Sequence, residues 1–154
     1  MSKLTLKVGD VAPEFDLPNE KNETVRLSDF KGKKNVILSF HPLAWTGICA
    51  VQMQDMDEAH EKLEALDTVG LGISVDSIPS KAAWFSALEL EHVIPLADFE
   101  PKGEVAKRYG VYREENGFSE RAVFVVDKGG VIRFAKVYPI KKKPDLQEIL
   151  DALS

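Results

Sequence analysis

The chain holds one cysteine, Cys49, and its neighbours favour a reactive thiol. Residues 36–40 form an apolar run typical of a buried strand, and residues 47–66 carry apolar side chains at helical spacing. Cys49 therefore falls in the first turn of a helix that follows a strand. The unpaired N–H groups and the positive dipole end of a helix start favour an anion, so this position favours a nucleophilic thiolate.

The alternative is an inert cysteine, because a lone cysteine is often a small residue of the core. The preceding residues argue against it. A core residue does not need the apolar turn of residues 43–45 before it. Thr46 supplies a hydroxyl three residues upstream that can hydrogen-bond a thiolate, and Pro42 restricts the backbone as the chain leaves the strand.

Pro42, Thr46 and Cys49 match the Pro-x-x-x-Thr-x-x-Cys signature of the peroxiredoxins, which are thiol-dependent peroxidases with a thioredoxin-like fold. The chain resembles the AhpC/TSA type of this family. Residues 42–49 resemble most the short one-cysteine alkyl hydroperoxide reductase E subfamily. The arginine that opens a late strand in the family corresponds to Arg121, and the likeness extends through residues 95–98 and 109–111.

The resemblance implies four catalytic residues. Cys49 attacks the peroxide, Thr46 holds the thiolate, and Arg121 stabilises negative charge on sulfur and on the peroxide oxygens. Pro42 shields the cysteine from water. The alternatives are a surface arginine that forms a weak ion pair with Glu120 or another carboxylate, and a proline that only ends the strand.

Further residues are expected to line the substrate pocket. Gln52 stands where the family commonly has a glutamate, so it can hydrogen-bond the arginine but brings no charge. His41 either tunes the pocket or packs, and Trp84 belongs to the core or lies near the active site. The expected pocket residues are His41, Leu43, Trp45, Ile48, Gln52 and Trp84.

The remaining patterns predict an α/β domain. A strand, helix and strand ending at residue 75 form a βαβ unit with parallel strands. A helix at residues 80–90, a strand at 93–97 and a helix at 103–109 follow. Residues 122–127 and 131–138 form a hairpin, and a helix runs from 144 to 153. This order predicts one thioredoxin-like domain over residues 1–154, with a central mixed sheet, flanking helices and an N-terminal extension.

Composition excludes several function classes. The net charge of −5 argues against a nucleic-acid binder, and residues 141–143 form the one basic cluster, expected to be a solvated loop. A single cysteine excludes an intrachain disulfide and a cysteine-cluster metal site, and the three histidines lack metal-ligand spacing. We therefore expect no metal or other cofactor. Without a signal-like or membrane-spanning apolar run, a cytoplasmic location is expected.

The resemblance implies a peroxidase that acts on hydrogen peroxide and organic hydroperoxides. Without a second cysteine, the oxidised Cys49 needs an external thiol, of thioredoxin-like, glutaredoxin-like or low-molecular-weight type. A homodimer is expected from the family alone. Two other classes stay open: a redox sensor that forms a mixed disulfide with a partner, and a thioredoxin-fold binding module with an inert cysteine. A glutathione peroxidase is disfavoured, because no glycine-rich segment leads into the cysteine.

Overall fold

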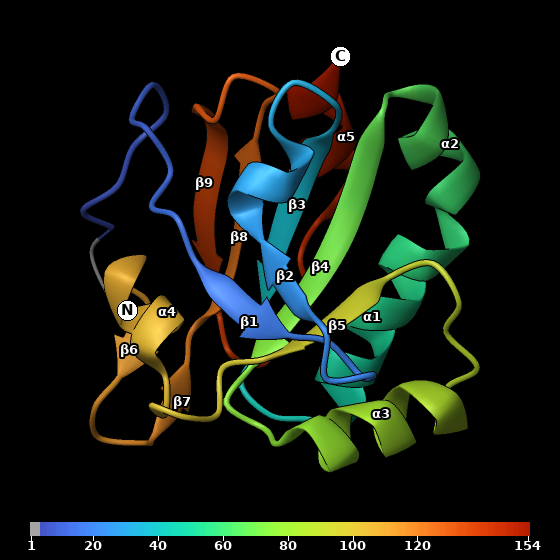
Figure 1. The fold of residues 1–154 in the computed structure, drawn as a ribbon, viewed down its shortest axis with the longest axis vertical. Coiled ribbons are helices and arrows are strands. Elements are labelled where there is room, and N and C mark those ends of the chain that lie inside the picture. The colour runs from blue at the N-terminus through green and yellow to red at the C-terminus, as the bar shows by residue number, and fades with distance from the viewer. Residues whose placement is uncertain (1–3) are drawn as a thin grey trace.

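A computed structural model describes residues 4–154, and its centre is a five-stranded mixed sheet (Figure 1). Strands β5, β4 and β3 are parallel, whereas β8 runs antiparallel to β3 and β9 antiparallel to β8. The predicted βαβ unit and hairpin are confirmed. The strand order is β5 (Ile94–Ala97), β4 (Thr68–Ser74), β3 (Asn35–Phe40), β8 (Arg121–Val126) and β9 (Ile132–Tyr138).

The sheet is covered on both faces, and alternate residues of one strand divide between the two cores. Ile37 of β3 packs on one face with apolar side chains of four helices, which are α1 (Gly47–Glu58), α2 (His60–Ala65), α3 (Ile78–Ala87) and α5 (Leu146–Leu153). Leu38 and Phe40 pack on the other face with the N-terminal segment and α4 (Glu104–Arg108).

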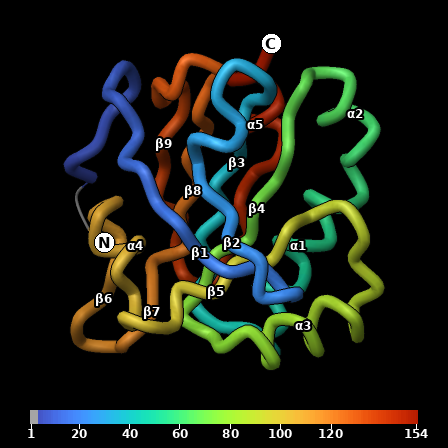
Figure 2. Tube along the Cα trace, viewed as in Figure 1, coloured from blue at the N-terminus to red at the C-terminus, as the bar shows by residue number. Residues whose placement is uncertain are grey.

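The N-terminal extension forms a small hairpin of its own. Strands β1 (Asp16–Pro18) and β2 (Thr24–Arg26) pair antiparallel and lead into a short 3-10 helix, η1 (Leu27–Phe30). In Figure 2 this blue segment crosses in front of the sheet. A second hairpin, of β6 (Tyr112–Arg113) and β7 (Phe118–Ser119), encloses residues 114–117.

The prediction of one helix over residues 47–66 was wrong. The helix is interrupted at Ala59, whose backbone angles are φ −84° and ψ 8°, so that α1 and α2 are separate. The His60 ring nitrogen lies 3.0 Å from the carbonyl oxygen of Asp57, which would accept the N–H of Glu61 in a continuous helix. The carboxylate of Asp57 meanwhile accepts backbone N–H groups of residues 91–93. These contacts with side chains and with a distant segment end the helix early.

The third helix is also shifted from its predicted range of 80–90. Ser77 is the N-cap residue of α3, and its hydroxyl accepts the N–H of Ser80, which starts the helix at Ile78. Among residues 4–154, no helix is long and apolar enough to cross a membrane.

Candidate active site

Cys49 lies in the first turn of α1, just past the end of β3, as predicted. Strand β8 pairs with β3 and places Ala122 opposite Phe40, so the preceding residue, Arg121, lies beside the start of α1. The Arg121 Nη1 donates to the Cys49 Sγ at 3.2 Å. A guanidinium at this distance stabilises a thiolate more than a neutral thiol.

Arg121 is held rigidly on its other side. Its Nε and Nη2 both donate to the carbonyl oxygen of Ile140, at 3.1 and 2.7 Å. The side chain is buried, with 3% exposed, so the alternative of a surface arginine is wrong. Glu120, the partner suggested for it, instead forms an ion pair with Arg113 at 2.8 Å. The Ile140 carbonyl could not be found from side-chain patterns, because it is a backbone group of a loop.

Gln52 lies within the arginine network, one helical turn after Cys49. Its Oε1 accepts from Arg121 Nη1 at 2.8 Å, and its Nε2 donates to Ser39 Oγ at 2.7 Å and to the Phe40 carbonyl oxygen at 3.2 Å. These partners fix the amide orientation, because only the oxygen can accept from the arginine. Gln52 therefore positions the guanidinium without adding a negative charge.

The segment between β3 and Cys49 is tied by local bonds. The Thr46 hydroxyl donates to the Leu43 carbonyl oxygen at 2.8 Å and is exposed, so its expected bond to the thiolate stays a prediction. Trp45 has a left-handed φ of 66°, and its Nε1 donates to Ser80 Oγ at 3.2 Å. Pro42 is buried, as a shielding residue requires.

His41 and Trp84 pack together beneath this segment, with ring centroids 5.2 Å apart. The His41 Nε2 lies 2.7 Å from the Nζ of Lys81, a buried residue that the sequence analysis did not single out. Lys81 lies three residues before Trp84 and four before Phe85, a spacing that puts all three on the core face of α3. That spacing was a usable signal. Leu43 and Ile48 are half-buried, and Trp45 is exposed.

Access to the sulfur is restricted. Cys49 is 0% exposed, so a molecule of the size of water does not reach it in this conformation. Any molecule that reacts with Cys49 must bring an atom to bonding distance of Sγ. Such a reaction would therefore include a movement of the side chains that cover Cys49.

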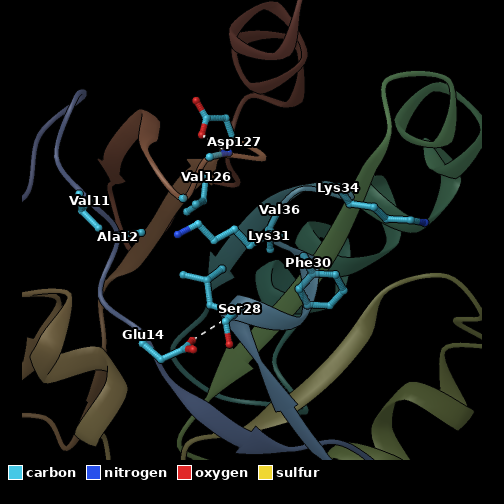
Figure 3. Close-up of a pocket in the computed structure, with 13 residues that line it drawn as sticks. Val11, Ala12, Glu14, Ser28, Phe30, Lys31, Lys34, Val36, Val126 and Asp127 are labelled. Carbon is cyan, nitrogen blue, oxygen red and sulfur yellow. Dashed lines mark hydrogen bonds between the residues drawn. The ribbon is translucent and has the colours of Figure 1, made fainter.

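A cavity of about 210 Å³ lies at the opposite end of the sheet (Figure 3). It is bordered by the N-terminal segment, η1, the start of β3 and the turn between β8 and β9, including Phe30, Lys31 and Val36. Its walls contain none of the residues that surround Cys49. Among residues 4–154, no three His, Cys, Asp or Glu side chains gather as a metal-binding group.

Known proteins are similar to this chain over most of its length. Residues 8–135 match the AhpC/TSA family. The chain is 38% identical over 150 residues to alkyl hydroperoxide reductase E of Mycobacterium tuberculosis, covering 97% of each chain. It is 34% identical over 138 residues to the chloroplastic 2-Cys peroxiredoxin BAS1 of Hordeum vulgare, covering 84% of this chain and 65% of the other. The reduced 2-Cys peroxiredoxin of Plasmodium vivax superposes with a TM-score of 0.86 at 28% identity, covering 96% and 80%.

Proposed function

The chain belongs to the AhpC/TSA family and is a thiol peroxidase, and on this premise we propose that it reduces hydroperoxides by a one-cysteine mechanism. The Cys49 thiolate attacks the terminal oxygen of the hydroperoxide. A sulfur–oxygen bond forms while the oxygen–oxygen bond breaks, and the leaving oxygen takes up a proton to depart as water or an alcohol. Cys49 is left as a sulfenic acid.

The observation that carries this proposal is the 3.2 Å contact between Arg121 Nη1 and Cys49 Sγ. The guanidinium keeps its charge at any physiological pH, and burial strengthens its field. It favours the thiolate before reaction. During reaction it lies next to the oxygens that gain negative charge as the peroxide bond breaks. Pro42 and the buried surroundings of Cys49 limit the water that competes for this charge.

The return to the thiol requires an external reductant, because the chain has one cysteine. A first thiol condenses with the sulfenic acid, releasing water and forming a mixed disulfide. A second thiol attacks that disulfide, releases the oxidised reductant as its own disulfide and returns Cys49. The two thiols come from one dithiol protein of thioredoxin or glutaredoxin type or from two low-molecular-weight thiols.

The test is the mass of the intact protein after a brief stoichiometric dose of hydrogen peroxide with dimedone present. We expect rapid addition of one dimedone to the wild type, slowed by about 100-fold or more in Arg121→Ala, since removal of one such donor has effects of that size elsewhere. The control is Arg133→Ala, which removes an exposed arginine of β9 that forms an ion pair with Asp127. It should react as the wild type does.

Two outcomes contradict the proposal. Oxidation of Cys49 no faster than that of a free cysteine would leave an inert cysteine in a binding module. Fast oxidation without turnover by any thiol donor would favour the redox sensor instead.

The apolar side chains Leu43, Trp45 and Ile48 precede or flank Cys49 and would accept an alkyl group, which supports organic hydroperoxides as substrates beside hydrogen peroxide. We also propose a homodimer, supported by the family and by the indole of Trp45, which is 57% exposed. Light scattering after size-exclusion chromatography tests this. A mass near twice 17.1 kDa supports it, and a monomer mass refutes it.

A further inference from the structure

Lys81 is a buried lysine next to the active site, with 1% of its surface exposed. Its Nζ lies 2.7 Å from His41 Nε2, 3.0 Å from Ser74 Oγ and 3.1 Å from the Gly72 carbonyl oxygen. An ammonium group has three hydrogens to donate, and here there are three acceptors. In this arrangement the neutral His41 ring accepts at Nε2 and carries its own proton on Nδ1.

The carboxylate of Asp76 is linked to the Lys81 ammonium through the hydroxyl of Ser74. Ser74 Oγ donates to Asp76 Oδ2 at 2.6 Å, and the same carboxylate oxygen accepts the backbone N–H of Ala44 at 2.8 Å. The network therefore runs from His41 through Lys81, Ser74 and Asp76 back to Ala44. Both of its ends lie in the segment that joins β3 to Cys49.

This network holds that segment at several points. The His41 ring is bound by Lys81, and the His41 carbonyl oxygen accepts from Ser119 Oγ at 3.2 Å. The Ala44 N–H is bound by Asp76. A shift of the segment relative to α3 therefore breaks its bonds to Lys81 and Asp76 and the bond from Trp45 Nε1 to Ser80 Oγ. In Figure 1, α3 crosses the end of the sheet at which β3 and β4 finish, where α1 also begins.

Charged groups on α1, on β8 and in the loop after β4 influence the pKa of Lys81 or of its partner His41. Burial lowers the pKa of Lys81 to about 7, an effect opposed by the charges of Asp76, which follows β4, and of Cys49 on α1. Burial, aided by the positive charges of Lys81 and of Arg121 on β8, holds the pKa of His41 well below its usual value. The histidine thus stays neutral. Lys81 and the Cys49 thiolate attract each other, so each charged form favours the other.

A simple packing role does not account for this group. A methionine would fill nearly the same space without the penalty of removing an ammonium from water. The side chain instead presents a positive charge from the side of α3, while Arg121 presents another from β8.

We propose that Lys81 is a positioning residue of the peroxidase site, whose charged form acts with Arg121 to favour the Cys49 thiolate and anchors the segment before Cys49 through His41. This inference rests on the proposed function. It adds a protonation-dependent control of Cys49 reactivity that Arg121, always charged, cannot provide.

The test measures two quantities between pH 5.5 and 9: the rate of Cys49 oxidation by hydrogen peroxide, and the thiolate absorbance at 240 nm. In Lys81→Met we expect oxidation at pH 6 to slow by about tenfold, the size of one unit of thiol ionisation. The difference should shrink to within about twofold at pH 9, where the wild-type lysine has lost its charge. Lys81→Arg keeps a charge and should restore most of the rate at pH 6. Lys62→Met, at an exposed lysine on α2, is the matched control and should follow the wild type.

A residue with a merely structural role would lower the rate by the same factor at every pH, and that result overturns the inference. If Lys81→Met does not fold, Lys81→Gln replaces it under the same criteria. The absorbance separates this inference from the proposed function. Slow peroxide oxidation of the wild type refutes the peroxidase, whereas a thiolate titration unchanged by loss of the Lys81 charge refutes the role of Lys81.

Discussion

At the scale of single residues, the site depends on how Arg121 divides its hydrogen bonds. Two of its nitrogens bind the Ile140 carbonyl oxygen, and the third is shared between Cys49 Sγ and the oxygen of Gln52. A neutral amide leaves the positive charge of the guanidinium to the sulfur. Where peroxiredoxins commonly carry glutamate, a carboxylate would compete for that charge.

Gln52→Glu should slow Cys49 oxidation by about tenfold at neutral pH, because the new carboxylate neutralises Arg121 and repels the thiolate. It should also lower the free energy of unfolding by about 1–3 kcal/mol, since the bonds to Ser39 Oγ and to the Phe40 carbonyl oxygen lose their donor. Peroxide-oxidation rates and urea unfolding measure the two effects. Gln54→Glu on the same helix is the control, and an equal slowing there would contradict the explanation.

At the scale of elements, α1 is fixed at both ends by different means. Its N-terminal turn is held by the network around Cys49. Near its C-terminal end, the Asp57 Oδ1 accepts the N–H groups of His92 at 2.7 Å and of Val93 at 3.0 Å. That carboxylate ties the helix to the segment that enters β5.

Asp57→Ala should lower the free energy of unfolding by about 1–3 kcal/mol, because it leaves N–H groups of residues 91–93 without their acceptor, including that of the buried Val93. The rate of Cys49 oxidation should stay within twofold, since Asp57 lies eight residues, or about 12 Å, further along α1. Urea unfolding and dimedone trapping test both parts. Glu58→Ala, at an exposed neighbour, should change neither. A tenfold slowing in Asp57→Ala would show that the two ends of α1 are coupled.

At the scale of the whole molecule, Lys81 makes the stability of the fold depend on pH. Its pKa is about 7 in the folded protein and near 10.5 when unfolded, so between these values the unfolded chain binds more protons. Stability from this group therefore rises with pH over that window. Below pH 7 the lysine is charged in both states, and the full penalty of burial applies.

Lys81→Met removes this dependence. Relative to the variant, the wild type should gain roughly 2–3 kcal/mol of unfolding free energy between pH 6 and pH 9, the integral of that proton difference. Urea unfolding of both proteins at the two pH values measures the change, with Lys62→Met as the control. Parallel pH dependences of wild type and Lys81→Met would mean that the lysine titrates normally in the folded protein.

The sequence by itself determined the features that rest on local patterns. A single cysteine in the first turn of a helix after a buried strand, the βαβ unit and the hairpin follow from periodicity and turn residues, and the structure confirms their placement. The arginine that opens a late strand was expected from the family resemblance, and Arg121 is the first residue of β8. Helix ends were less certain, because the break at Ala59 depends on contacts between Asp57 and residues 91–93 that periodicity does not record.

Only the tertiary structure decided which groups meet at Cys49. Arg121 is 72 positions from Cys49 and reaches Sγ because β8 pairs with β3. The residue pattern of a strand does not predict which other strand it pairs with. The Ile140 carbonyl is a backbone group with no signature in side-chain type. Lys81 and His41 are 40 positions apart, and the sequence indicated a pocket position for His41 but no contact between the two residues. Their contact exists because α3 packs beside the strand ends, which buries Lys81 against His41 and the end of β4 and lowers its pKa.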